Sequence, residues 1–154
     1  MWFEDIPLHV KTVLGSYTFT EENILAFARI YDPQPFHIDK EAAAHSPYGG
    51  IIASGWHTAA VWMKLTIAHR RAAVEAGAAA TQDNYVSPGV RDLRWHRPVR
   101  PGTTLIYTNE TSAKLDWPSR PTFGLLEGTN EARDAEGALY YSFVNRVLIA
   151  RRPK

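Results

Sequence analysis

The sequence contains no cysteine among its 154 residues. This absence excludes disulfide bonds, cysteine–zinc sites and a thiol nucleophile. No stretch approaches the roughly 18 apolar residues that a membrane-spanning helix requires. The N-terminal residues 1–5 are acidic, whereas a secretory signal begins with basic residues. We therefore expect a soluble cytoplasmic protein that has no membrane partner.

The sequence also lacks any strong excess of charge, because 17 Lys and Arg residues face 16 Asp and Glu residues for a net charge of +1. Such a balance gives no reason to expect nucleic acid as a partner. Apolar residues make up 45% of the chain, which is enough for a hydrophobic core. We expect one domain over residues 1–154. The aromatic residues number five Trp, seven Tyr and six Phe, and they fit either a core with an oligomer interface or a ligand tunnel.

The first half of the chain shows helical patterns after one short strand. Residues 17–20 alternate aromatic and polar side chains, which is typical of a strand. Thr20 then suits an N-cap, and residues 21–31 carry an apolar face at helical spacing. This helix must end near Asp32, because a residue that precedes proline disfavours the helical conformation.

A short helix is expected over residues 39–45, and a long or kinked one over residues 51–80, with a weaker pattern beyond residue 71. One stripe of the long helix carries apolar residues at steps of three and four, and we expect it to face the core. Its members are Ile52, Trp56, Ala59, Ala60, Met63 and Ile67. Small residues at positions 53–55 permit close packing against the start of this helix.

The pattern of the second half of the chain predicts consecutive strands. They are expected over residues 90–95, 103–113, 122–132 and 138–150, with a hairpin turn over 134–137. A helical half followed by antiparallel strands predicts an α+β domain in which a curved sheet wraps around a long helix.

The segment over residues 31–39 carries the strongest chemical signal. Asp32 follows a helix, where the macrodipole disfavours a carboxylate by about 0.3–1 kcal/mol. Pro33 and Pro35 hold the loop that joins Asp32 to His37, so the two side chains can face one another as a proton-transfer pair. A turn-opening Asp and a structural His are the plainer alternative. Asp39 completes no metal site, because no second histidine stands at ligand spacing.

This segment resembles the hydratase motif of MaoC-like dehydratases and (R)-specific enoyl-CoA hydratases. The motif runs Gly-Asp-x-Asn-Pro-x-His-x-Asp, followed by a helix of small residues that ends in His-Gly-Met. Asp32, Pro35, His37 and Asp39 match the motif, and Gly55 stands at the glycine position. Residues 89–103 also resemble the strand and turn in the second half of these proteins.

The resemblance implies a hot-dog fold and a reversible hydro-lyase acting on a 2-enoyl or 3-hydroxyacyl thioester of coenzyme A or an acyl carrier protein. It implies that Asp32 and His37 together hold a water molecule that attacks the β carbon, although the sequence does not divide the acid and base roles. The backbone N–H of Gly55 would donate to the thioester oxygen. The resemblance also implies a homodimer and no cofactor.

The chain departs from the motif at Tyr31, Gln34 and Ser54, where the family usually has Gly, Asn and His. We expect Ser54 and Trp56 to contact the acyl group. Arg94 belongs to a basic run that fits either a solvated face or the phosphates of coenzyme A, and the run is completed by Arg91, Arg97 and Arg100.

Three further interpretations stay open. His57 follows Trp56 and fits a core or interface histidine better than a ligand. Two alternatives to the hydro-lyase function also remain: a hot-dog acyl thioesterase and a non-catalytic acyl-binding subunit. Ser54 lacks the Gly-x-Ser-x-Gly frame of a serine nucleophile.

Overall fold

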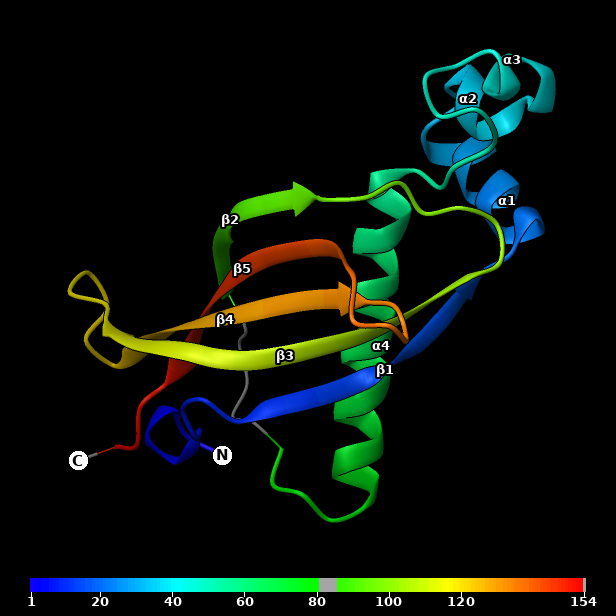
Figure 1. Cartoon of the computed structure of the whole chain (residues 1–154). Coiled ribbons are helices and arrows are strands. Elements are labelled where there is room, and N and C mark those ends of the chain that lie inside the picture. Colours follow the sequence, from blue (N-terminus) through cyan, green and yellow to red (C-terminus); the bar gives the residue numbers. More distant parts are fainter. Residues whose placement is uncertain (81–85, 154) are drawn as a thin grey trace.

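A five-stranded antiparallel sheet with the order β1-β3-β4-β5-β2 dominates the computed structural model, which describes residues 1–80 and 86–153. The strands are β1 (Lys11–Phe19), β2 (Val86–Trp95), β3 (Thr103–Asp116), β4 (Phe123–Arg133) and β5 (Leu139–Ala150). The sheet curves around one long helix, α4 (Gly55–Glu75), which lies against its concave face (Figure 1). The expected α+β hot-dog fold is therefore confirmed.

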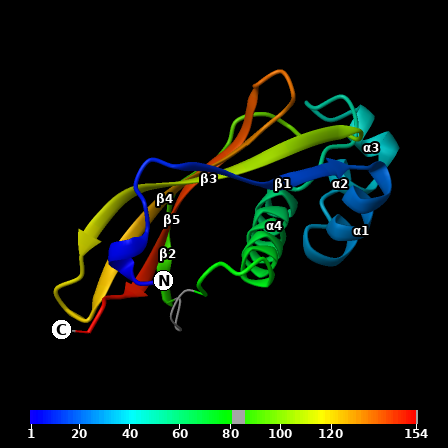
Figure 2. The same cartoon turned by 90° about the horizontal axis from the view of Figure 1, so that it is seen from below.

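Short helices gather at the end of the molecule where α4 begins (Figure 2). They are α1 (Glu21–Tyr31), α2 (Pro35–Ile38) and α3 (Lys40–Ala44), and the 3-10 helix η1 (Phe3–Asp5) lies at the opposite end. The Thr20 side chain caps α1 by accepting from the Asn23 amide, and α1 ends at Asp32 as expected. The stiff loop expected after Asp32 contains α2, because Pro35 occupies the first helical position, where its fixed φ is favourable.

Both ends of α4 differ from the expected ends. The helix begins at Gly55 rather than at residue 51 and ends at Glu75 rather than near residue 80. Gly77 has a φ of +92°, in the left-handed region that commonly terminates helices. Part of the expected connecting loop falls on residues 81–85, which lie outside the described residues.

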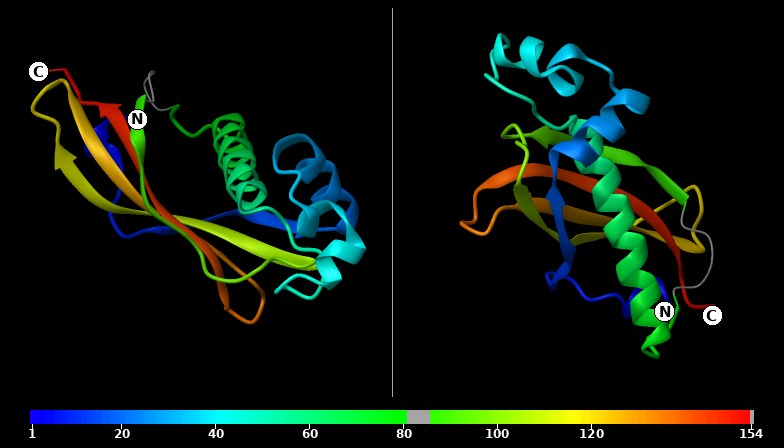
Figure 3. Two further views of the ribbon diagram at one scale, coloured as in Figure 1. Left: turned by 90° about the horizontal axis from the view of Figure 1, so that it is seen from above. Right: turned by 90° about the vertical axis from the view of Figure 1, so that its right-hand side faces the viewer.

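The expected core-facing stripe was wrong for its large helical members, because Trp56, Met63 and Ile67 are 58%, 51% and 44% exposed. Ile52 is buried as expected, but it precedes α4, and Ala59 packs against the core. The buried residues of the helix are His57, Thr58, Val61 and Thr66. Large buried rings from the sheet, including Tyr107, Tyr141 and Phe143, fill the space beneath α4. The helix therefore buries these residues toward the sheet and leaves Trp56, Met63 and Ile67 exposed. Figure 3 shows α4 lying along one face of the curved sheet.

The sheet strands extend beyond their expected limits. β2 begins at Val86 instead of residue 90, and β3 continues to Asp116 instead of residue 113. The β4–β5 hairpin turns where expected, since the Asp134 amide donates to the Ala138 carbonyl and Gly137 has a φ of +87°. β2 forms one edge of the sheet, and its side chains are exposed along nearly all of its length.

Candidate active site

Asp32 and His37 face each other at the junction of α1 and α2. Asp32 is the C-cap of α1, and His37 lies on α2 after the two prolines. The Nε2 atom of His37 lies 3.3 Å from Oδ2 of Asp32, and the two side chains are only 6% and 16% exposed. The structure thus brings together the two residues that the sequence proposed as a pair.

Two neutral donors hold the Asp32 carboxylate. The Ser54 hydroxyl donates to Oδ2 at 2.6 Å, and the Gln34 amide donates to Oδ1 at 2.8 Å. Burial alone would raise the pKa of Asp32, but these two hydrogen bonds and the nearby His37 together lower it below its ordinary value. Asp32 is therefore ionised near neutral pH and is ready to accept a proton.

The backbone fixes the orientation of the His37 ring. Its Nδ1 atom lies 2.7 Å from the carbonyl oxygen of Ile52, which can only accept a hydrogen bond. Nδ1 must therefore carry a hydrogen and donate it, so Nε2 is the nitrogen that can take up or release a proton toward Asp32. The chain just before α4 thus orients the imidazole as well as supplying Ser54.

A cavity of about 470 Å³ opens beside this pair. Its walls come from the α1–α2 junction, the start of α4, and the end of β2 with the following loop. They include Asp32, Gln34, Phe36, His37, Tyr48, Ile52, Ala53, Gly55, Trp56, Thr58, Trp95, Arg97, Val99 and Tyr140. Such a volume falls within the range of small-ligand sites.

Gly55 is the first residue of α4 and lines this cavity. Its N–H lies in the first turn, where helical amides have no intrahelical acceptor, and no hydrogen bond from it is found to the described residues. A Cβ atom at position 55 would collide with the Trp95 ring. Trp95 Nε1 also donates to the Gly55 carbonyl at 2.9 Å. The structure therefore shows close packing of Gly55 against Trp95, and the role of its amide as a donor to the thioester oxygen stays a prediction.

A family model described as the MaoC like domain matches residues 7–123. The chain belongs to the MaoC-like dehydratase family. A solved MaoC-like dehydratase from Rhodospirillum rubrum is 30% identical to this chain, with a TM-score of 0.82 over 100% of this chain and 99% of the other. The (R)-hydratase from A. caviae involved in PHA biosynthesis is 21% identical, with a TM-score of 0.68 over 97% of this chain and 99% of its own, and this likeness shows the fold alone.

An uncharacterised relative shares a shorter segment. The protein YdeM of Bacillus subtilis (strain 168) is 42% identical over 52 residues, which is 34% of this chain. The match spans 37% of the length of YdeM.

Two departures from the family motif lie next to Asp32. Gln34 and Ser54 stand where the family usually has Asn and His, and both donate to the Asp32 carboxylate. Ser54 is fully buried and caps α4 by accepting from the Trp56 amide, so it lies behind Asp32 and outside the cavity lining. The structure therefore gives Ser54 a position suited to holding Asp32 rather than to touching an acyl group.

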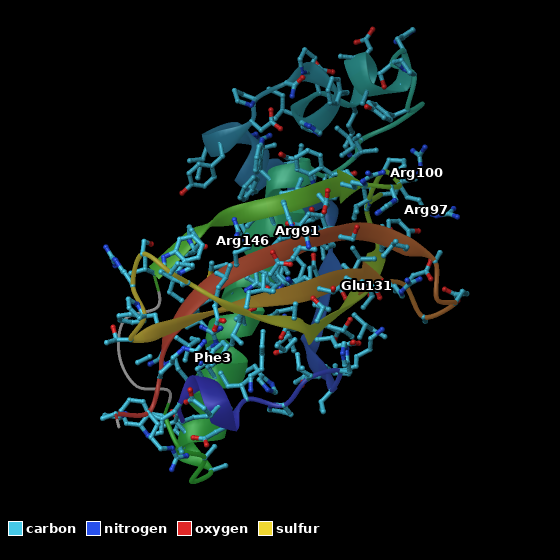
Figure 4. All side chains as sticks on the ribbon, turned by 90° about the vertical axis from the view of Figure 1, so that its left-hand side faces the viewer. Phe3, Arg91, Arg97, Arg100, Glu131 and Arg146 are labelled. Carbon is cyan, nitrogen blue, oxygen red and sulfur yellow. The ribbon has the colours of Figure 1, made fainter. Side chains whose placement is uncertain are left out.

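Of the two residues Trp56 and Arg94, both expected to contact the ligand, only Trp56 lines the cavity. Trp56 lines the cavity, with its ring edge-on to Trp95 at 5.2 Å between centroids. Arg94 is exposed and is not part of the lining, whereas Arg97 from the same basic run does line the cavity. Figure 4 shows Arg97 and Arg100 close together at one end of the sheet and Arg91 over its middle, where Arg91 pairs with Glu127 at 2.7 Å.

Sequence reasoning missed Trp95 and the Ile52 carbonyl as parts of this site. Every residue has a backbone carbonyl, so the residue types could not predict that the Ile52 carbonyl would bind His37. Trp95 was predicted only as the end of a strand, and the strand pattern does not show that its ring would reach Gly55 of α4.

His57 is buried among aromatic rings beside this site. It stacks on Phe27 with 4.5 Å between centroids and lies edge-on to Phe19 and Tyr17. Burial lowers the pKa of His57 to about 4, so the ring is neutral near neutral pH. Its position agrees with the expected core histidine.

Within residues 1–80 and 86–153, no three His, Asp or Glu side chains form a group suited to a metal ion. The helices of the same residues are too short or too polar to span a lipid bilayer.

Proposed function

We propose that this protein catalyses the reversible addition of water to a 2-enoyl thioester, giving a 3-hydroxyacyl thioester. The observation that carries the proposal is the Asp32–His37 pair, which lines a cavity together with the Gly55 end of α4. Membership of the MaoC-like dehydratase family and the shared fold of a solved (R)-hydratase support it.

In the hydration direction, a water molecule lies between Asp32 and His37. The ionised Asp32 carboxylate accepts a proton from this water as its oxygen forms a bond to the β carbon. Nε2 of His37, in its protonated form, supplies a proton to the α carbon. The proton gained by Asp32 then returns to His37 across the 3.3 Å contact, which resets both groups.

Negative charge develops on the thioester oxygen during this addition. We propose that the Gly55 N–H, at the positive end of the α4 macrodipole, donates to that oxygen. Gly55 would then form the oxyanion hole, as the resemblance implies.

We propose that the phosphate-bearing carrier, coenzyme A or an acyl carrier protein, leaves the cavity on the side of Arg97 and His96. Both residues line the cavity and are exposed. Arg100 stands next to this edge and donates to the Tyr48 carbonyl at 2.7 Å. Cationic side chains at this edge of the cavity would form charge-assisted hydrogen bonds with the phosphate oxygens of the carrier.

We also propose that two copies pair through β2. This edge strand offers unpaired backbone groups, and Val86, Val90 and Trp95 on it are 45%, 53% and 44% exposed. The outward stripe of α4 adds further uncovered apolar surface. Light scattering should give the mass of two chains for the wild type and of one chain for Val90→Lys. A monomeric wild type would contradict the pairing.

The test is to follow crotonyl-CoA by loss of enoyl absorbance with purified protein. A thiol-reactive dye in a parallel reaction reports thioester hydrolysis, and calorimetry reports binding. Water addition without thiol release supports the hydratase. Thiol release instead would establish the thioesterase, and binding without conversion would establish a non-catalytic acyl-binding protein.

A further inference from the structure

A second cavity of about 290 Å³ lies beneath the C-terminal half of α4. Its walls combine aliphatic residues, among them Leu14, Val74, Leu126, Val147 and Ile149, with polar ones that include His69, Arg70 and Glu127. Among the described residues, none lines both this cavity and the one beside Asp32. The first cavity touches the start of α4 and the second touches its C-terminal half, so something along the helix must separate them.

The separation is a wall of large buried side chains. Thr58 of α4 lines the first cavity, and the Tyr107 hydroxyl donates to its carbonyl at 3.2 Å. Trp62, one turn further along α4, lines the second cavity and contacts Phe143 edge-on at 4.7 Å between centroids. Tyr141 joins Phe143 at 5.4 Å. The three sheet residues of this wall, Tyr107, Tyr141 and Phe143, are at most 3% exposed.

Hydrogen bonds keep Trp62 in place. Its Nε1 donates to Oδ1 of Asn130 at 2.8 Å, and Asn130 is fully buried. Asn109 donates to the same oxygen at 2.8 Å, while the Asn130 amide donates to Asn145 at 2.8 Å. The indole is therefore tied to the sheet and is not free to swing aside for a ligand.

The two ends of the first cavity differ in character. His96 and Arg97 mark one side, whereas Ile52, Ala53 and Thr58 offer no charge at the inner end. A thioester whose oxygen meets the Gly55 amide and whose carrier leaves past Arg97 must direct its acyl tail toward this inner end. Thr58 is three residues beyond Gly55, which is about 4.5 Å along the helix, and Trp62 is about 10 Å beyond it.

We propose that this wall restricts the substrate to acyl groups short enough to end before it, and that Trp62 is the residue that closes the second cavity to longer chains. This inference rests on the proposed hydration activity. The second cavity is then the space that a medium-length acyl tail would occupy if the wall were open.

The first part of the test compares wild-type kcat/KM for crotonyl-CoA, 2-hexenoyl-CoA and 2-octenoyl-CoA. We expect the value for the octenoyl substrate to be about 100-fold below that for crotonyl-CoA, because its tail collides with a rigid wall. Equal values for the two would overturn the chain-length inference and leave the hydratase proposal standing. Absence of turnover with all three substrates would overturn both.

The second part opens the wall with Trp62→Ala. Asn130 keeps the donor from Asn109, so the change leaves no buried acceptor unpaired. We expect octenoyl turnover to rise about tenfold while crotonyl turnover persists, which also reports that the variant is folded. Trp117→Ala is the matched control, since Trp117 follows β3, lines neither cavity and contacts Arg146. Loss of preference in the control variant, or an unchanged preference in an active Trp62→Ala, would overturn the role of Trp62.

Discussion

Nε2 of His37 lies 3.3 Å from Oδ2 of Asp32, while the opposite ring nitrogen lies 2.7 Å from the Ile52 carbonyl. One ring nitrogen therefore donates to the backbone, and the other contacts the Asp32 carboxylate, which Ser54 and Gln34 keep ionised. The chemistry proposed for the cavity depends on this single contact, and the predictions below change the groups that hold it.

Ser54→Ala removes a donor to the Asp32 carboxylate. Because that hydrogen bond lowers the pKa of Asp32, its loss raises the pKa. If ionised Asp32 is required, kcat/KM falls as the pH drops through this pKa, so the acid limb of the profile moves to higher pH in the variant. We also expect turnover at neutral pH to fall by about tenfold or more, the equivalent of a hydrogen bond to a charged group. An unmoved acid limb would contradict the role of Ser54.

Ser54→Gly separates this role from helix capping. Alanine at an N-cap costs about 1 kcal/mol of stability, whereas glycine costs only a few tenths relative to serine. The glycine variant should therefore unfold at nearly the wild-type urea concentration and still show the displaced acid limb. A normal pH profile for Ser54→Gly would show that capping alone explains the effect of alanine.

Gly55→Ala tests the close approach of Trp95. The added methyl group collides with the indole, and we expect a loss of about 1–3 kcal/mol in the free energy of unfolding. Trp95→Ala in the same chain should remove the collision, so the double variant should be more stable than the sum of the single changes predicts. Additive losses in urea unfolding would mean that the two residues do not compete for space.

His57 should make stability fall in acid. Its folded pKa of about 4 lies below the ordinary 6.5, so the unfolded chain binds more protons between these values. Stability is then present above about pH 6.5 and is lost as the pH falls toward 4, by roughly 3 kcal/mol from this residue. His57→Phe keeps the aromatic packing and should reduce the loss measured by urea unfolding at the two pH values. An equal loss in the variant would remove His57 as its cause.

Local signals predicted the fold and the proximity of Asp32 and His37 well. The Thr20 cap, the hairpin at residues 134–137 and the proline-held approach of Asp32 to His37 are set by neighbouring residues, so one sequence reveals them. Gln34 was recognised only as a departure from the motif, and its hydrogen bond to Asp32 shows what that departure contributes.

The orientation of α4 could not be predicted in the same way. Helical spacing identified the stripe of Trp56, Met63 and Ile67, but spacing does not say which surface the stripe meets. Tyr107 and Tyr141 arrive from strands far along the chain and fill the space beneath the helix, so the apolar stripe faces outward. The sequence also could not show which arginine of the basic run lines the cavity. The path of the chain after β2 brings Arg97 there instead of Arg94.

The most direct test is hydration of crotonyl-CoA by Asp32→Asn, a change that preserves shape but removes the proton acceptor. Circular dichroism and urea unfolding would confirm that the variant folds. We expect kcat/KM to fall by about 10²–10⁴-fold, the usual contribution of a positioned acid or base. A folded Asp32→Asn protein that hydrates crotonyl-CoA at the wild-type rate would contradict the central claim.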